Sequence, residues 1–269
     1  MQSELNQNTV NTKLDPKLLE REAYDFLSQD KLIEAYRMFR KAAQRFKLKG
    51  NYKQAALCFA SAASCWSKKS GERIFNNAAV AYEEAAKAAI ADRNYQYGSL
   101  LYKHAAINHE RDGELFDFSR CFYLSKETAR KHFARSLFFL AAANNSSGSK
   151  ETDYSKNFIM RFFSWLVLTF SYIIWGHGEK PSRTFFAGLL IIFTATLLYL
   201  NGSLANALGV FKPTFFDSLY FSVVTFTTVG YGDIFPAGFS KLVAIFESLS
   251  GLFIIPLFVI GLSRKYLRA

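Results

Sequence analysis

The sequence predicts an all-α protein in which an N-terminal α-solenoid is followed by a membrane domain. Three observations lead to this prediction: a change of composition near Asn157, a repeated pattern of small and aromatic residues within 31–135, and two long uncharged runs near the C-terminal end. The mean hydropathy is close to zero (+0.02) because a charged, alanine-rich half offsets an apolar one. A chain of 269 residues is long enough for two domains.

The net charge limits the classes of partner, and the cysteine usage indicates the cellular compartment. The net charge is +11, but basic residues alternate with acids and form no dense block, so we expect no nucleic acid as partner. The positive excess fits a position against an anionic cytoplasmic leaflet. Cys58, Cys65 and Cys121 form no CxxC pair, which favours reduced cytosolic thiols over disulfides. We also expect no secretory signal in the polar first thirty residues.

The N-terminal domain, residues 1–143, is predicted from a pattern that recurs five times within 31–135. Each copy begins with an apolar or aromatic residue. A small residue follows three positions later, a usually aromatic residue four positions after that, and a pair of adjacent small residues begins three positions further on. The copies begin at residues 32, 52, 75, 95 and 118, so their starts lie 20, 23, 20 and 23 residues apart. The spacings place these positions along one stripe of a helix, and the small residues let neighbouring helices approach closely.

The repeated copies resemble tetratricopeptide repeats and, more closely, the longer-helix repeats of soluble NSF attachment proteins. The resemblance implies stacked antiparallel helix pairs with a grooved surface, so a cytosolic protein or peptide is the expected partner. His104, His109 and His132 have no metal-ligand spacing and are interpreted as ordinary helix residues. Because no nucleophile–base arrangement and no glycine-rich phosphate loop is found, we expect no enzymatic activity and no cofactor.

Residues 144–156 are predicted to be a flexible linker, because a run rich in Asn and Ser interrupts the helical pattern. A helix and a turn are predicted for 157–183. Arg161 and several hydroxyl side chains interrupt its apolar sequence. We interpret the helix as lying in the membrane interface, because a third span would place the cysteine-bearing repeat domain outside the cell; a helix that crosses the bilayer is the alternative. Trp165 and Trp175 are then expected near the depth of the lipid headgroups.

The C-terminal domain, residues 184–269, contains the two uncharged runs. They predict an outer span at 184–205 and an inner span at 240–262, in which the run from Leu242 to Leu262 is interrupted only by Glu247. About 20 helical residues cross the hydrocarbon core of a bilayer. Two spans return the chain to the side from which it came. We therefore expect a multi-pass protein of the cell membrane with both termini in the cytoplasm.

A segment of special composition, Thr227-Thr-Val-Gly-Tyr-Gly-Asp233, lies between the two spans. Backbone carbonyl groups can replace the water shell of a cation without a full charge that would trap it. The carbonyls of a short stretch face one axis only if alternate residues adopt unusual dihedral angles. Gly230 and Gly232 permit these angles because they lack a Cβ. Val229 and Tyr231 would then direct their side chains away from the axis.

This segment resembles the selectivity filter of two-transmembrane potassium channels, with the filter pentapeptide at 228–232. The resemblance implies that Thr228, Val229, Gly230, Tyr231 and Gly232 bind potassium as the permeant ion, which is the only metal expected. One chain supplies one strand of the oxygen cage. Four chains are therefore required, and we expect a homotetramer in the lipid bilayer.

A pore helix is predicted at 215–226, with Thr214 as its N-terminal cap. By the same resemblance, Tyr220 and Phe221 occupy the positions of an aromatic pair that packs behind the filter. The C-terminal end of this helix would face the central cavity, where the negative end of the helix dipole favours a cation.

The filter is expected to depend on supporting residues around it. Thr227 precedes it and Asp233 follows it, but the acid with which some relatives pair this aspartate is replaced by Val224. We expect Tyr220 to take the place of that acid. Glu247 is expected to form a hydrogen bond to the back of the pore helix, and an ion- or proton-sensing role is the alternative.

The inner span contains two residues that can bend a helix. Gly251 lies 18 residues after Asp233, where the family has a bending glycine, and Pro256 follows it. These residues would let the segment that begins at Val259 open or close the cytoplasmic mouth. Two static bends are the alternative.

The sequence therefore predicts a passive potassium conductance whose gate is biased by the repeat domain. Helices rich in Arg and Lys of the voltage-sensor type are missing, so we expect no strong voltage gating. Two other functions remain open. One is a poorly selective cation channel, against which the intact glycines argue, and the other is a membrane-anchored adaptor whose solenoid recruits proteins.

Overall fold

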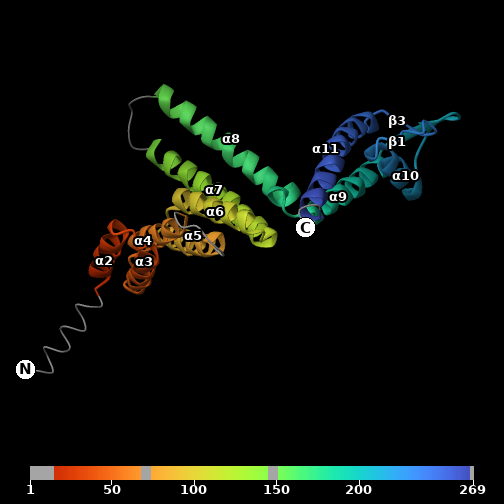
Figure 1. Cartoon of the computed structure of the whole chain (residues 1–269). Helices are drawn as coiled ribbons and strands as arrows, with labels where there is room; N and C mark the ends of the chain where they lie inside the picture. The colour runs from red at the N-terminus through yellow and green to blue at the C-terminus, as the bar shows by residue number, and fades with distance from the viewer. Residues whose placement is uncertain (1–14, 68–73, 145–150, 267–269) are drawn as a thin grey trace, which may run out of the picture. The chain divides into compact units, whose positions relative to one another are not determined.

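The computed structural model describes residues 15–67, 74–144 and 151–266 (Figure 1). The chain divides into two compact units, Met1–Thr169 and Phe170–Ala269. The unit boundary falls inside a helix rather than at the predicted linker. Part of that predicted linker, residues 145–150, lies outside the described residues.

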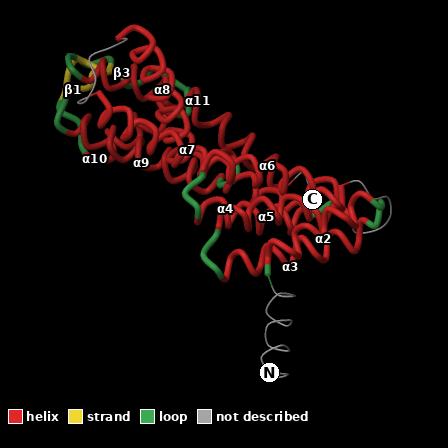
Figure 2. The backbone as a smooth tube through the Cα atoms, turned by 90° about the vertical axis from the view of Figure 1, so that its left-hand side faces the viewer, coloured by secondary structure: helices red, strands yellow, loops and turns green. Residues whose placement is uncertain are grey.

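The first unit is a series of helices in which each helix from α2 to α6 packs against the next one along the chain (Figures 1 and 2). Short turns connect most of them, so neighbouring helices run antiparallel. The helices are α2 (Pro16–Ser28), α3 (Leu32–Leu48), α4 (Tyr52–Ser67), α5 (Ile74–Ala91), α6 (Tyr95–Asp112) and α7 (Leu115–Asn144), followed by most of α8 (Glu151–Trp175).

The repeated pattern explains the core of this unit. Phe39, Phe59 and Tyr102, at the aromatic position, are at most 4% exposed, and burial of each such ring contributes about 1.5–3 kcal/mol. The first position is less regular, since Phe75 remains 37% exposed. The small pairs are almost fully buried and allow close helix contact: Ala42–Ala43, Ala62–Ala63, Ala85–Ala86 and Ala105–Ala106.

The turn between α5 and α6 has an unusual backbone. Arg93 adopts a φ of +61°, in the left-handed region that disfavours residues with a Cβ. The next residue, Asn94, caps α6, because its side chain accepts a hydrogen bond from the amide of Tyr97 at 3.1 Å. This turn therefore changes the chain direction within two residues.

The second unit combines apolar helices with a small sheet. Its elements are the end of α8, the 3-10 helix η1 (Gly176–Gly178), α9 (Pro181–Leu200), β1 (Ser203–Asn206), β2 (Gly209–Phe211), α10 (Phe215–Phe226), β3 (Phe235–Ala237) and α11 (Ser240–Tyr266). The antiparallel sheet has the strand order β2-β1-β3, with Leu204 opposite Phe211 on one side and Pro236 on the other. The sequence did not predict this sheet.

The two long helices α9 and α11 run antiparallel and contact each other at both ends. Tyr199, near the end of α9, forms a hydrogen bond with Glu247 near the start of α11. At the other end, a Cβ on Gly261 would lie 3.2 Å from the Cβ of Pro181. A core of Ala195, Tyr199, Leu204, Phe221 and Val243 joins α9, the sheet, α10 and α11.

The predicted outer span, 184–205, is wrong at both ends. The helix α9 begins at Pro181 and ends at Leu200, where the amide of Gly202 bonds to the carbonyl of Tyr199 at 2.9 Å. The uncharged residues that follow form strand β1, because hydropathy does not distinguish an apolar strand from the end of a helix. The predicted inner span, 240–262, is too short, since α11 continues to Tyr266.

The predicted linker and the helix after it also need correction. Residues 151–156 belong to α8, so the predicted linker 144–156 is too long and the helix assigned to 157–183 begins too late. These six residues are polar but contain neither glycine nor proline, so nothing in them prevents a helix.

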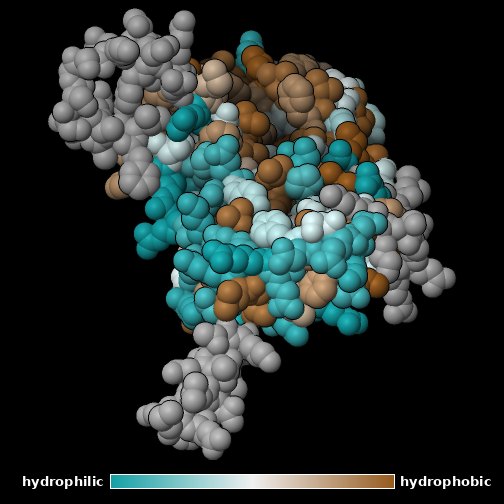
Figure 3. All heavy atoms as spheres, turned by 60° about the vertical axis from the view of Figure 1, so that its left-hand side comes forward, coloured by the Kyte–Doolittle hydropathy of each residue, from teal (hydrophilic) through white to brown (hydrophobic). Residues whose placement is uncertain are grey.

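Apolar surface is extensive on the helices from α8 onward. Among the described residues, three helical segments are long and apolar enough to cross a membrane: Phe158–Gly178, Pro181–Leu200 and Ser240–Tyr266. Figure 3 shows apolar residues gathered on one part of the surface and hydrophilic residues covering most of another. Side chains such as Phe186, Phe246 and Phe253 are at least 66% exposed, which fits a lipid or protein environment rather than water.

Candidate functional site

The loop after α10 has an alternating backbone. Thr228, Gly230 and Gly232 have φ angles of +59°, +56° and +78°, whereas Val229 and Tyr231 between them do not have positive φ. Such alternation allows successive carbonyl groups to face the same side of the loop. The sequence predicted this conformation at the two glycines, and Thr228 extends it by one further residue.

The helix α10 places this loop. Thr214 and Asp217 form a capping box, in which the Thr214 hydroxyl accepts from the Asp217 amide at 3.3 Å and the Asp217 carboxylate accepts from the Thr214 amide at 3.0 Å. At the other end, the amides of Thr228 and Val229 donate to the carbonyls of Thr225 and Val224 at 3.1 Å. The loop therefore leaves the negative end of the helix dipole directly.

Hydrogen bonds anchor the two ends of the loop. The hydroxyl of Thr227 donates to the carbonyl of Val223 at 2.7 Å. The hydroxyl of Tyr220 donates to the carboxylate of Asp233 at 2.8 Å, which is the pairing that the sequence suggested. The amide of Ile234 also donates to Asp233, at 3.0 Å. These contacts tie both ends of the loop to α10 and to the chain that follows.

Two of the predicted supporting residues, Phe221 of α10 and Glu247 of α11, are buried. The ring of Phe221 packs edge-on against that of Tyr199, with 4.9 Å between centroids. Glu247 is only 2% exposed and accepts hydrogen bonds from the hydroxyl of Tyr199 at 2.7 Å and from the hydroxyl of Ser222. Because Ser222 belongs to α10, Glu247 links α11 to the back of that helix and to α9.

Variants of Glu247 are expected to separate a hydrogen-bonding role from a charge role. Glu247→Gln should unfold at nearly the wild-type temperature, because the amide can still accept from Tyr199. Glu247→Leu should be destabilised by about 1–3 kcal/mol, since it leaves the buried hydroxyl of Tyr199 without its acceptor. The hydroxyl of Ser222 keeps the carbonyl of Ile192, at 3.0 Å, as an alternative acceptor. Thermal unfolding of the full-length protein measures both. Equal losses of stability in the two variants would instead show that the charge of Glu247 is required.

The predicted gate residues all lie on α11 but in different surroundings. Gly251 is buried against the end of α10, where an added Cβ would overlap the carbonyl oxygen of Phe226 and lie 2.9 Å from its carbonyl carbon. The structure therefore uses Gly251 for close helix packing, a role that the sequence did not suggest. Pro256 is exposed within the continuous helix, and Val259, one turn later, is 54% exposed.

A contact at the end of α11 escaped the sequence analysis. A Cβ on Gly178, whose φ is +88°, would lie 2.9 Å from Nη1 of Arg264. Beside it, Arg183 donates to the carbonyl of Tyr172 at 2.7 Å and lies 4.6 Å from the centre of its ring. The turn between α8 and α9 thus contacts the end of α11. Arg183, near the start of α9, holds that helix to α8. No sequence signal marks a contact between residues so far apart in the chain.

The repeat unit contains a buried cluster that could be mistaken for a metal site. Glu83, His109 and Cys121 place ligand atoms within 4.8 Å of one another. Both oxygens of Glu83 also accept from Arg120, at 2.7 and 2.9 Å, and one of them contacts Nε2 of His109 at 2.9 Å. Because a guanidinium group already neutralises the carboxylate, we interpret the cluster as a structural network joining α5, α6 and α7.

The ionisation of Glu83 should make this unit sensitive to acid. Burial raises the pKa of Glu83, but the hydrogen bonds from His109 and Arg120 outweigh it and lower the pKa from 4.5 to about 2. Because the pKa is lower in the folded state, the ionised carboxylate stabilises the fold above pH 4.5. This contribution is lost as the pH falls from 4.5 towards 2.

Glu83→Gln is therefore expected to lower the free energy of unfolding by about 3 kcal/mol at neutral pH, which corresponds to the shift of the pKa. The difference from wild type should shrink below pH 4.5. Denaturant unfolding of the full-length protein, followed by helical circular dichroism, measures it. Glu84→Gln is the matched control, since its partly exposed ion pair with Arg40, at 3.8 Å, should contribute less than about 1 kcal/mol.

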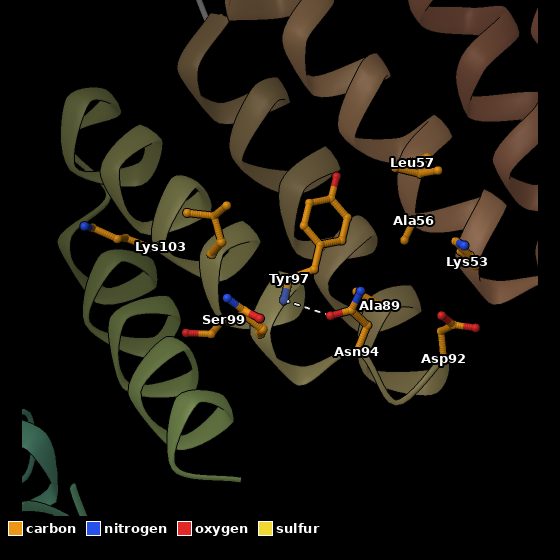
Figure 4. Close-up of a pocket in the computed structure, with 11 residues that line it drawn as sticks. Lys53, Ala56, Leu57, Ala89, Asp92, Asn94, Tyr97, Ser99 and Lys103 are labelled. Carbon is orange, nitrogen blue, oxygen red and sulfur yellow. Dashed lines mark hydrogen bonds between the residues drawn. The ribbon is translucent and has the colours of Figure 1, made fainter. Parts of the chain in front are cut away.

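A cavity of about 630 Å³ opens between α4, α5 and α6 (Figure 4). Leu57, Ala89 and Leu100 contribute apolar surface, and Tyr97 stands in the middle of the view. Lys53 and Lys103 lie at opposite sides of the cavity. The sequence predicted a groove on this unit but not its position, because the lining residues come from three helices.

Two family models match separate parts of the chain. Residues 186–267 match the model described as ion channel, and residues 15–117 match the model of the soluble NSF attachment protein, SNAP. Neither family is of an enzymatic kind. Comparisons with curated proteins and with solved structures gave no match.

The two matched segments coincide with the two architectures. The ion-channel model spans nearly all of α9, the sheet, α10 with its loop, and α11, whereas the other model covers α2 to α6 and the start of α7. Over 186–267 the chain is thus similar to ion channels, and over 15–117 it is similar to soluble NSF attachment proteins. The ion-channel similarity and the long apolar helices together indicate a membrane protein.

Proposed function

We propose that this chain is one subunit of a potassium-selective channel that conducts passively through a pore built from four copies. The observation that carries the proposal is the backbone of Thr228–Gly232, with positive φ at alternate residues and a position at the end of α10. Carbonyl oxygens presented in this way can replace the hydration shell of a potassium ion. The negative end of the α10 dipole adds attraction for a cation.

The exposure of the filter side chains supports assembly. Val229 is 53% exposed and Tyr231 is 72% exposed, although such side chains must be packed if they are to hold the loop rigid. Further copies around a fourfold axis would cover them, and an ion-channel family is consistent with an oligomer in a membrane. Native mass spectrometry in lipid nanodiscs is expected to give the mass of four chains. A monomer would contradict the proposal.

Ion flux into proteoliposomes tests conduction. The full-length protein should carry potassium down its gradient without an energy source, and sodium should cross much more slowly. Empty liposomes provide the baseline. Equal potassium and sodium fluxes would favour a poorly selective cation channel. Absence of flux, together with a retained protein partner, would favour the membrane-anchored adaptor.

The gate is proposed to lie at the end of α11, around Val259, with Pro256 as the bend. The proposed route from the repeat region runs through α8 and η1 to Arg264, because Gly178 in η1 contacts that side chain. In this proposal α8 lies in the membrane interface with both termini in the cytoplasm, so a force on α8 reaches η1. The apolar and exposed face of α8, which includes Ile159, Phe163 and Phe170, would lie toward the lipid.

Gly178→Ala is expected to change the open probability and to leave the ion selectivity unchanged. The alanine Cβ would press on Arg264, and a φ of +88° costs a residue with a Cβ about 1–2 kcal/mol. Single-channel recording measures both quantities. Gly113→Ala is the control, because its φ is +83° but the surrounding space is open. An unchanged open probability for Gly178→Ala would contradict the proposed route.

We propose that a cytosolic peptide or protein binds the 630 Å³ cavity of the repeat region and biases the gate. Such a partner shifts the gate only if it binds the open and closed forms unequally. The apolar surface from Leu57 and Leu100, with lysines on both sides, suits an apolar segment flanked by acidic residues. Removal of residues 1–150 should change the open probability, and an unchanged value would count against a regulatory repeat region.

A further inference from the structure

A smaller cavity of the repeat unit has a different character from the one in Figure 4. It has a volume of about 370 Å³ and lies between the α5–α6 turn, the start of α6 and the C-terminal half of α7. Ligand cavities are usually lined mainly by apolar side chains. The residues that line this cavity are instead charged, polar or, in the case of Tyr95, aromatic: Asp92, Arg93, Asn94, Tyr95, Gln96, His132, Arg135 and Ser136. A lining of this kind suits a small, strongly hydrogen-bonding ligand.

The charges around the cavity favour an anion. Arg93 and Arg135 line it together with one acid, Asp92. Arg161 of α8 lies close enough to His132 to lower the pKa of its imidazole, although burial is the larger cause of that shift. Among the residues that line the cavity, two guanidinium groups stand against one carboxylate, which leaves one positive charge. In addition, His132 and Tyr95 carry side chains that can donate hydrogen bonds.

The side chain of one arginine is held in place. The guanidinium group of Arg135 lies 5.7 Å from the ring centre of Tyr95, within the range of a cation–π contact. Arg93 belongs to the turn and has a backbone φ of +61°, a conformation that glycine or asparagine adopts more easily. A planar guanidinium group in a fixed position matches two oxygens of a phosphate group.

We propose that this cavity binds a phosphate-bearing ligand of about the size of a sugar phosphate. Arg93 and Arg135 bind the phosphate oxygens, and Arg161 adds long-range attraction. The ligand can be soluble, or it can be the headgroup of a phosphorylated lipid, because the chain continues from α7 into the apolar α8. This site is separate from ion conduction and does not depend on the proposed function.

Binding to the full-length protein in detergent tests the site with a soluble probe, inositol 1,4,5-trisphosphate, by calorimetry. Flotation with phosphatidylcholine vesicles, with and without phosphatidylinositol 4,5-bisphosphate, tests the lipid source. The test variants are Arg93→Gly and the double variant Arg93→Gly/Arg135→Gln. Arg93→Gly should fold at least as well as wild type, because glycine suits the positive φ. The control is Arg37→Gln/Arg45→Gln, which removes two exposed charges from α3.

The wild-type protein should bind at least one of the two probes. The double variant should bind it at least about tenfold more weakly, the loss expected when charge-assisted hydrogen bonds are removed, and Arg93→Gly should lie between. The control should bind like wild type. Binding of the trisphosphate alone identifies a soluble ligand, and binding only to the phosphoinositide vesicles identifies a lipid. Absence of both, or equal losses in the control, would overturn the proposal.

Discussion

Gly230→Ala is expected to abolish the preference for potassium or to stop conduction. The φ of Gly230 is +56°, and a residue with a Cβ adopts this region at a cost of about 1–2 kcal/mol. Four copies of the filter together would lose about 4–8 kcal/mol, and 1.4 kcal/mol already corresponds to a factor of ten in an equilibrium. The filter would therefore adopt a different backbone, and its carbonyl groups would no longer face one axis. Potassium and sodium fluxes into proteoliposomes measure the effect.

Gly238→Ala is a closely matched control for this substitution. Gly238 lies between β3 and α11, has a φ of +55°, and, like Gly230, has open space where a Cβ would be added. The two alanines should therefore impose similar backbone penalties, but only the one at Gly230 alters the filter. Gly238→Ala should keep potassium selectivity. If Gly230→Ala also kept it, the filter conformation would not determine selectivity and the mechanism would be wrong.

Gly251→Ala is expected to prevent assembly of a conducting protein. The added Cβ would overlap the carbonyl oxygen of Phe226, a backbone atom that cannot turn away as a side chain can. Overpacking usually costs about 1–3 kcal/mol, and a clash with backbone belongs at or above the upper end of that range. The overlap is relieved only if α11 moves away from the end of α10, where Thr227 precedes the filter and Thr228 begins it. Size-exclusion chromatography and flux assays measure the outcome.

Gly261→Ala provides the comparison on the same helix. There the added Cβ would lie 3.2 Å from the Cβ of Pro181, so a shift of a few tenths of an ångström is sufficient. This variant should assemble and conduct nearly as the wild type does. Normal assembly and conduction of Gly251→Ala would show that α10 and α11 are not packed through this glycine. In that case the hinge role that the sequence suggested would be the better account.

Features that depend on nearby residues could be predicted from the sequence. The repeated spacing marked the helices α3 to α7, and the short motif with glycines at 230 and 232 marked the loop with positive φ. The threonine cap marked the start of α10. In each of these cases the determining residues lie within one helix, one turn or one loop, so periodicity and residue preference are sufficient.

Features that depend on contacts between distant residues could not be predicted in this way. Gly251 meets Phe226 and Gly178 meets Arg264 only after the helices have packed, and glycine at either position is also compatible with a bend or a turn. The network around Glu83 joins residues from three helices. The end of α9 was misplaced because the apolar residues of β1 continue the hydropathy of the helix.

The reversal potential of single channels under bi-ionic conditions tests the central claim most directly. With potassium on one side of the bilayer and sodium on the other, each tenfold preference shifts the reversal potential by about 59 mV. We predict a shift of more than about 100 mV, which means that potassium is preferred about fiftyfold or more. A reversal potential near zero would show that the filter does not distinguish the two ions and would contradict this account.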